Sequence, residues 1–158
     1  MNRDWHAPSR RKMLLAGFAG MAATAAGISL VEASPEQVAE EVKKVTGGKA
    51  ASDGKIKLDL PSIAENGLVV PLNFEIESPM TEKDYVKAIH VLTEKNPQPN
   101  VVSVHLGPRA GRASITTRVR LADTQTVTAI AQLSDGSLWV DRVPVVVTLS
   151  ACLEDGLI

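Results

Sequence analysis

The chain has 158 residues, of which 44% are hydrophobic and only 3% aromatic, and its formal net charge at pH 7 is −1. The length predicts one ordinary domain, and the near-neutral charge excludes a strongly basic nucleic-acid-binding surface. With so few aromatic side chains, the core has to be built from Val, Ile and Leu.

Residues 1–33 have the features of an export signal. The sequence Arg-Arg-Lys at 10–12 precedes an apolar run that reaches about Ile28 and is rich in Gly and Ala. A charged start, a short apolar run and small residues at its end are typical of a cleavable signal, and the paired arginines predict the twin-arginine route. We place cleavage near Ala33 and expect a periplasmic protein. An uncleaved N-terminal anchor is the alternative interpretation.

One short helix is expected at the start of the mature chain. Ser34 and Pro35 are typical of a helix start, and Gln37 would complete a capping box. Three valines that follow share one helical face, and the pair Gly47–Gly48 ends the helix.

From Gly48 to residue 149 the apolar residues no longer recur with the period of a helix. They recur at every second position, as they do in strands. Alternation of apolar and polar residues predicts strands at 56–60, 70–76, 89–91, 102–106, 113–121, 127–133 and 143–149. Turn residues separate them, and Pro71 and Pro144 suggest edge strands or strand starts. The predicted fold of 34–149 is all-β: an immunoglobulin-like β-sandwich of about seven strands preceded by one short N-terminal helix. We expect each strand to have one face on the core and one in water.

Few side chains suggest cofactor chemistry. His90 and His105 are predicted on separate strands, both facing solvent, and no cysteine or carboxylate cluster accompanies them as a metal site would require. We therefore expect no metal and no cofactor. Arg118 and Arg120 share a strand face that is either solvated, partner-facing or anion-binding.

Cys152 is the only cysteine, and six residues follow it in the sequence. The strand pattern places Leu149 and Ala151 on the core face and Cys152 on the opposite face, which favours an accessible thiol. A small buried residue ending the last strand is the alternative. Glu154 and Asp155 oppose thiolate formation, and no neighbouring histidine or lysine can act as a base. The sequence therefore predicts a thiol that other proteins modify, rather than the nucleophile of a cysteine enzyme.

The segment from residue 34 to 152 resembles the SoxY family of thiosulfate-oxidation carrier proteins. The stretches that carry the resemblance are Ala64-Glu65-Asn66-Gly67, Ser78-Pro79-Met80, Asn96-Pro97-Gln98-Pro99 and Arg118-Val119-Arg120-Leu121-Ala122. The resemblance implies a non-enzymatic periplasmic protein that forms a heterodimer with a SoxZ subunit. It also implies a C-terminal arm at 150–158 that holds sulfur intermediates on Cys152. A haem enzyme, a sulfate-releasing hydrolase and a sulfane dehydrogenase would act on that arm in turn.

The arm departs from the family pattern, in which two glycines flank the cysteine on each side. Here the neighbours of Cys152 are Ser150, Ala151 and Leu153, which allow fewer backbone conformations than glycine. The alternative interpretation is therefore a divergent, non-catalytic SoxY-like binding or assembly module that has lost the carrier arm.

A partner is also expected from the residues themselves. Tyr85, Trp139 and the Val-rich stretch Val145–Val147 are predicted to lie under a subunit that covers one face or edge of the sandwich.

Overall fold

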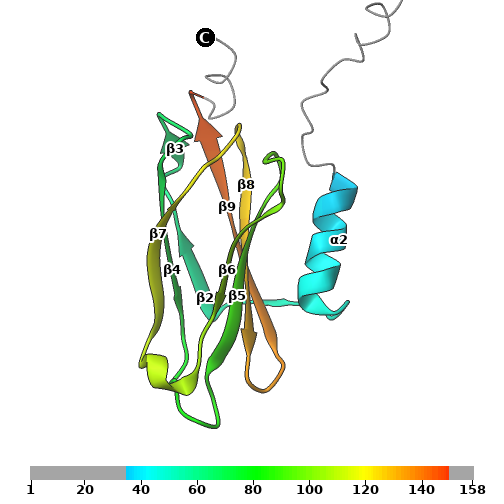
Figure 1. The fold of residues 1–158 in the computed structure, drawn as a ribbon, viewed down its shortest axis with the longest axis vertical. Coiled ribbons are helices and arrows are strands. Elements are labelled where there is room, and N and C mark those ends of the chain that lie inside the picture. Colours follow the sequence, from blue (N-terminus) through cyan, green and yellow to red (C-terminus); the bar gives the residue numbers. More distant parts are fainter. Residues whose placement is uncertain (1–34, 150–158) are drawn as a thin grey trace, which may run out of the picture. The chain divides into compact units, whose positions relative to one another are not determined.

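The computed structural model describes residues 35–149 as one α-helix, one short 3₁₀-helix and two facing β-sheets (Figure 1). In chain order the elements are α2 (Pro35–Thr46), β1 (Ser52–Asp53), β2 (Ile56–Asp59), β3 (Ile63–Ala64), β4 (Val70–Ile76), β5 (Val86–Thr93), β6 (Asn100–His105), η2 (Pro108–Ala110), β7 (Ala113–Val119), β8 (Gln125–Leu133) and β9 (Leu138–Val147). The architecture confirms the predicted immunoglobulin-like sandwich and its leading helix. The seven longer strands overlap the predicted stretches, whereas the two-residue strands β1 and β3 were not predicted.

The two sheets differ in size. The larger has the order β1-β9-β8-β5-β6, with β3 pairing to a second part of β9, and the smaller has the order β2-β4-β7. The short strands β1 and β3 run parallel to β9, and the longer strands pair antiparallel. An Asp135-Gly136 turn joins β8 to β9, with Gly136 at φ 82°, a conformation that glycine adopts without strain.

The core between the sheets is aliphatic, as the composition requires. In β4 every second residue from Val70 to Ile76 is buried, and the facing strand β8 buries Val127, Ala129 and Ala131. Phe74 is 1% exposed and provides the largest of the fully buried side chains. Burying each such aliphatic or aromatic side chain stabilises the fold by about 1.5–3 kcal/mol, and this burial holds the two sheets together.

Helix α2 covers part of the outer face of the larger sheet, on the side away from β2, β4 and β7 (Figure 1). Val42 and Val45 of the helix pack against a second hydrophobic cluster there. The sheet residues of that cluster are Leu92, Ile130, Leu138 and Val140. The prediction that every strand has one face in water is therefore wrong for β5, β8 and β9. The predicted helix end is confirmed, since Gly47 and Gly48 have positive φ and the Gly48 amide donates to the Lys43 carbonyl at 3.1 Å.

Both strand prolines lie where a strand lacks a neighbour on one side. Pro71 is the second residue of β4, beyond the point where β2 ends opposite Asn73. Pro144 lies between the parts of β9 that pair with β1 and with β3. The missing proline N–H therefore costs no ladder hydrogen bond on those sides, which agrees with the prediction of edge-like positions.

Candidate functional site

The predicted carrier residue Cys152 and its neighbours Ser150, Ala151 and Leu153 lie outside the described residues. The description ends at Leu149, three residues before the thiol. The candidate site is therefore defined by the end of β9 that carries the arm, and by the contacts that hold it.

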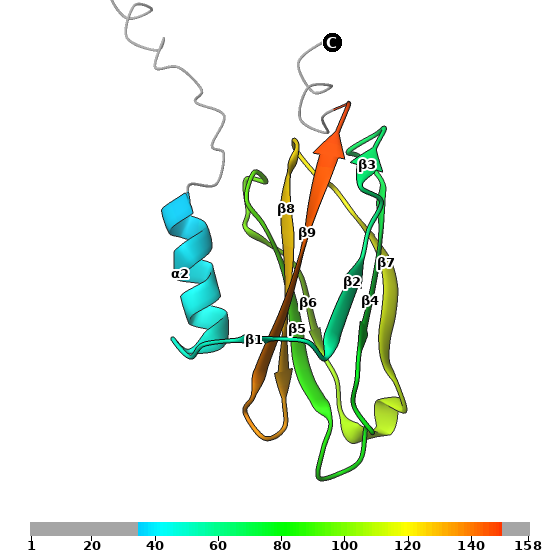
Figure 2. The same cartoon turned by 180° about the vertical axis from the view of Figure 1, so that it is seen from behind.

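The segment at 62–67 fixes the end of β9 by backbone hydrogen bonds. The Thr148 amide donates to the Ala64 carbonyl at 3.0 Å, and the Gly67 amide donates to the Leu149 carbonyl at 2.8 Å. Figure 2 shows β3 beside the last part of β9, on the side toward β4. The stretch Ala64-Glu65-Asn66-Gly67, which carries part of the resemblance, thus forms a clamp on residues 147–149. We call residues 147–149 the arm root, because the predicted arm begins at residue 150.

Two threonines add side-chain contacts to this clamp. The Thr148 hydroxyl donates to the Glu65 carbonyl at 3.1 Å, and the Thr124 hydroxyl accepts from the Val147 amide at 3.0 Å. Neither threonine was singled out in the sequence, because nothing local distinguishes it from any other strand-end threonine. Together the contacts hold the chain in place up to Leu149, and two residues of the sequence separate Leu149 from Cys152.

A buried asparagine supports the clamp from behind. The Leu121 amide donates to the Gly67 carbonyl at 2.8 Å. The segment around Leu121 is held by Asn96, which donates to the Arg120 carbonyl at 2.7 Å and accepts from the Ala122 amide at 2.9 Å. The resemblance-bearing stretches around residues 96 and 120 therefore connect by hydrogen bonds to the residue that binds the Leu149 carbonyl.

The histidines form a pair but no cluster. The rings of His90 and His105 lie 6.0 Å apart at 83°, and His90 Nδ1 is 2.9 Å from the Ser103 hydroxyl. Burial lowers the pKa of His90, His105 lowers it further, and Glu41 opposes the change. The expectation that both rings face solvent is wrong for His90, which is half-buried. Within residues 35–149, no group of three His, Cys, Asp or Glu side chains is arranged to hold a metal ion.

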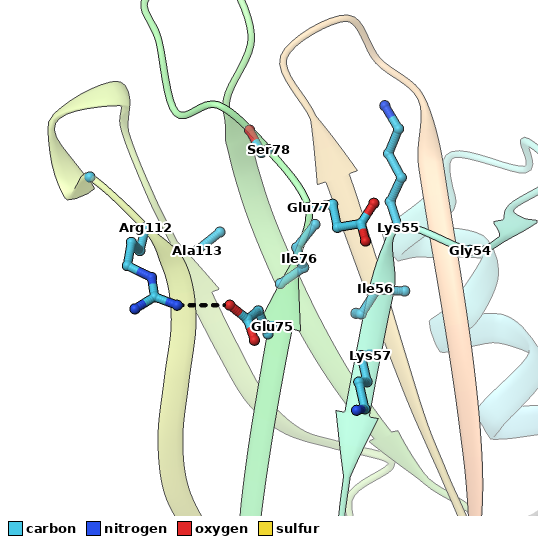
Figure 3. A pocket seen from close by; sticks show the side chains of 11 residues that line it. Gly54, Lys55, Ile56, Lys57, Glu75, Ile76, Glu77, Ser78, Arg112 and Ala113 are labelled. Atoms are coloured by element: carbon cyan, nitrogen blue, oxygen red, sulfur yellow. Dashed lines mark hydrogen bonds and ion pairs between the residues drawn. The ribbon is translucent and has the colours of Figure 1, made fainter.

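A hollow of about 420 Å³ lies at the far end of the smaller sheet (Figure 3). Arg112 and Glu75 face each other there at 3.0 Å, and both are exposed. The hollow adjoins Ile76, whereas the arm root adjoins the Val70 end of the same strand. At about 3.3 Å per residue these ends are roughly 20 Å apart, beyond the reach of a three-residue tether. The hollow is therefore separate from the candidate site.

One expectation about the last strand is wrong, and the expected partner surface stays a prediction with two of its valines buried. Leu149 is exposed rather than on the core face, because β9 ends at Val147 and the alternation ends with it. In the stretch expected to lie under a partner, Val145 and Val147 are buried in the core of the chain itself. Tyr85 and Trp139 are half-buried against that same core, so their apolar surface is largely used within the domain.

Comparison with known families gives a match to the model described as sulfur oxidation protein SoxY, over residues 42–152. The chain belongs to the SoxY family. The match ends at Cys152, and it confirms the resemblance found in the sequence. Membership implies, for the family in general, partnership with a SoxZ-type subunit.

Solved structures agree with this assignment. The sulfur carrier protein SoxY from Chlorobium limicola f. thiosulfatophilum superposes with a TM-score of 0.61 at 26% identity, covering 73% of this chain and 100% of that one. A superoxide reductase (neelaredoxin) from Ignicoccus hospitalis has a TM-score of 0.54 at 14% identity, covering 74% and 95%. A putative superoxide reductase from Thermotoga maritima has 0.50 at 17%, covering 62% and 87%. The two reductases show the fold alone.

The family and the Chlorobium structure together support a carrier role in sulfur oxidation, which agrees with the expectation that the chain is not an enzyme. A separate comparison with curated proteins finds no match to the chain. Within the described residues, no helix is long and apolar enough to cross a bilayer.

Proposed function

We propose that this protein is a periplasmic sulfur carrier that holds intermediates of thiosulfate oxidation covalently on Cys152. It would be exported by the twin-arginine route and would act in a complex with a SoxZ-type subunit. The observation that carries the proposal is the family match, which extends through the arm root and reaches Cys152.

The arm root has the construction that such a role needs. The clamp fixes the chain at Leu149, so Cys152 follows a defined point of the sandwich after only two intervening residues. A single cysteine also leaves the thiol without an intramolecular disulfide partner. It therefore remains available to form a bond to sulfur.

The chemistry of loading sets the requirements for the partners. Joining thiosulfate to the thiol forms an S–S bond, releases the thiol proton and removes two electrons, giving a protein–S–S–SO₃⁻ adduct. A haem enzyme of the kind the family implies would accept those electrons. The carrier itself supplies the thiol and the docking surfaces, and it needs neither a base nor a metal.

The test is the intact mass of the protein after incubation with thiosulfate and the haem enzyme. We expect a gain of one sulfur and one SO₃ group, lost again on reduction and absent in Cys152→Ser. A thiol reagent should also label the native protein about as fast as the urea-unfolded one. If labelling requires unfolding, the thiol is structural and the carrier proposal is wrong.

One observation favours the second candidate, a binding or assembly module without carriage. Ser150, Ala151 and Leu153 replace the glycines that the family arm places around its cysteine. The double variant Ala151→Gly, Leu153→Gly separates the two candidates. A carrier should load in the wild type, and the variant should load at least as fast. A module that has lost carriage should load only after the glycines are restored.

A further inference from the structure

The exposed large aliphatic side chains of residues 35–149 gather at one end of the sandwich. They are Ile63, Val69, Val146 and Leu149, with exposed fractions of 59%, 57%, 48% and 45%. We call these four residues the arm-root cluster. Isolated exposed apolar residues are ordinary, but a group at one end of a domain marks an interaction surface.

Backbone pairing fixes the cluster in place. Ile63 and Val146 are register partners in the parallel pair of β3 and β9, so their side chains lie on the same face of neighbouring strands. The Val146 amide donates to the Ser62 carbonyl at 2.9 Å. Leu149 is bound to Gly67, two residues before Val69. Ile63 and Val146 are therefore adjacent on the surface, and Val69 and Leu149 belong to the two segments that the clamp joins.

The distance to the thiol identifies what meets this surface. Cys152 follows Leu149 by three residues, and three extended residues span about 10 Å. Any protein that encloses the Cys152 sulfur in its own active site must bring the rim of that site within this distance of the arm-root cluster. Because the cluster is apolar, the rim gains affinity if it is apolar too.

The cluster by itself is smaller than the interface of a permanent subunit. Four aliphatic side chains that expose about half their surface offer on the order of 300 Å² of apolar area, whereas a stable interface buries roughly 800 Å² of polar and apolar surface on each partner. A small apolar contact suits a protein that binds briefly, reacts and leaves.

We propose that the arm-root cluster is the docking surface for the enzymes that act on sulfur bound to Cys152, and that these enzymes carry an apolar rim around the active-site entrance. This inference rests on the proposed carrier function. Under this proposal the enzymes recognise both the C-terminal arm and this surface of the folded domain.

The test compares Ile63→Lys and Val146→Lys with Thr116→Lys, which introduces the same charge at an exposed position of β7 in the smaller sheet. Each variant is first loaded with tetrathionate, a small reagent that needs no docking. The thiol displaces thiosulfate, releasing a proton and leaving protein–S–S–SO₃⁻. The sulfate-releasing hydrolase implied by the family then adds water to the terminal SO₃ group, giving sulfate, two protons and a persulfide anion that stays on Cys152.

We expect equal loading by tetrathionate in all variants. For sulfate release, KM should rise about tenfold for the two cluster variants and stay unchanged for Thr116→Lys, because a charge must be desolvated where an aliphatic contact was lost. The milder variant Ile63→Thr, which keeps the branched strand side chain, should raise KM less and covers the case in which a lysine perturbs folding.

Unchanged KM in the cluster variants, with the wild type processed normally, overturns the docking surface and leaves the carrier function standing. Loss of binding to a SoxZ-type subunit in the cluster variants overturns it as well, since the surface would then belong to the permanent interface. A loaded wild type that releases no sulfate overturns the carrier function together with the docking surface.

Discussion

Replacing Asn96 by alanine should destabilise the whole domain, because this buried side chain makes three hydrogen bonds. It donates to the Arg120 carbonyl at 2.7 Å and accepts from the Ala122 amide at 2.9 Å and from Gln125 Nε2 at 3.1 Å. Asn96 is 7% exposed and Gln125 5%, so water cannot easily replace the lost partner. At about 1 kcal/mol for each bond, Asn96→Ala should lower the free energy of unfolding by about 3 kcal/mol.

The variant Asn96→Asp tests the donor separately. It keeps an oxygen for the Ala122 amide and Gln125, but places a second carboxylate oxygen against the Arg120 carbonyl, where Asn96 donated. Burial and that contact should raise the pKa of the introduced carboxyl above its unfolded value of about 3.9. Its ionisation therefore destabilises the fold at pH 7, and the deficit should shrink as pH falls through the raised pKa.

Urea unfolding followed by circular dichroism measures both effects. Asn73→Ala is the matched control, because Asn73 is less buried and makes one long contact of 3.5 Å to Asp59. The control should cost well under about 1 kcal/mol. Asn96 does not hold this segment by its hydrogen bonds if Asn96→Ala costs no more than the control, or if the deficit of Asn96→Asp does not depend on pH between 7 and 4.

Two further predictions concern the outer face of the larger sheet. Val42→Asp should loosen α2 from its cluster and speed amide exchange along the helix, whereas Ala39→Asp on the exposed side should not; hydrogen exchange with mass spectrometry compares them. For His90, whose pKa burial holds below 6.5, stability should be full above pH 6.5 and should fall as the pH drops from there toward the folded pKa, because the unfolded chain binds the proton first. His90→Gln should flatten that slope in pH-dependent thermal melts, and an unchanged slope would contradict the assignment.

The sequence predicted the sandwich because alternation is a local signal that each strand carries by itself. It failed on the outer sheet face, since the pattern in β8 does not reveal that Ile130 is covered by a helix some 90 residues earlier in the chain. The same limit explains His90, whose neighbours Ser103 and Glu41 come from other elements.

The candidate carrier residue Cys152 stays a prediction from the sequence, and the contacts before it were not predictable. Cys152 stands out because it is a single thiol in a chain for which the sequence predicts an export signal, and both features are read from the sequence alone. The clamp depends on Gly67 and Thr124, which meet the end of β9 only through strand pairing between distant segments. Leu149 was misplaced because alternation cannot show where a strand ends when its neighbours end first.

The clamp and the altered arm bear on the same property of a carrier, which is how its thiol enters another protein. A chain fixed at Leu149 leaves Ser150 and Ala151 as the tether, and both residues have fewer backbone conformations than the glycines of the family pattern. Under the proposed carrier function, fewer accessible backbone conformations between Leu149 and Cys152 would require the sandwich itself to be correctly placed before the thiol could enter an active site. Contacts at the arm root would supply that placement, so the loss of glycine from the arm and the gathering of apolar side chains around Leu149 are explained by one requirement.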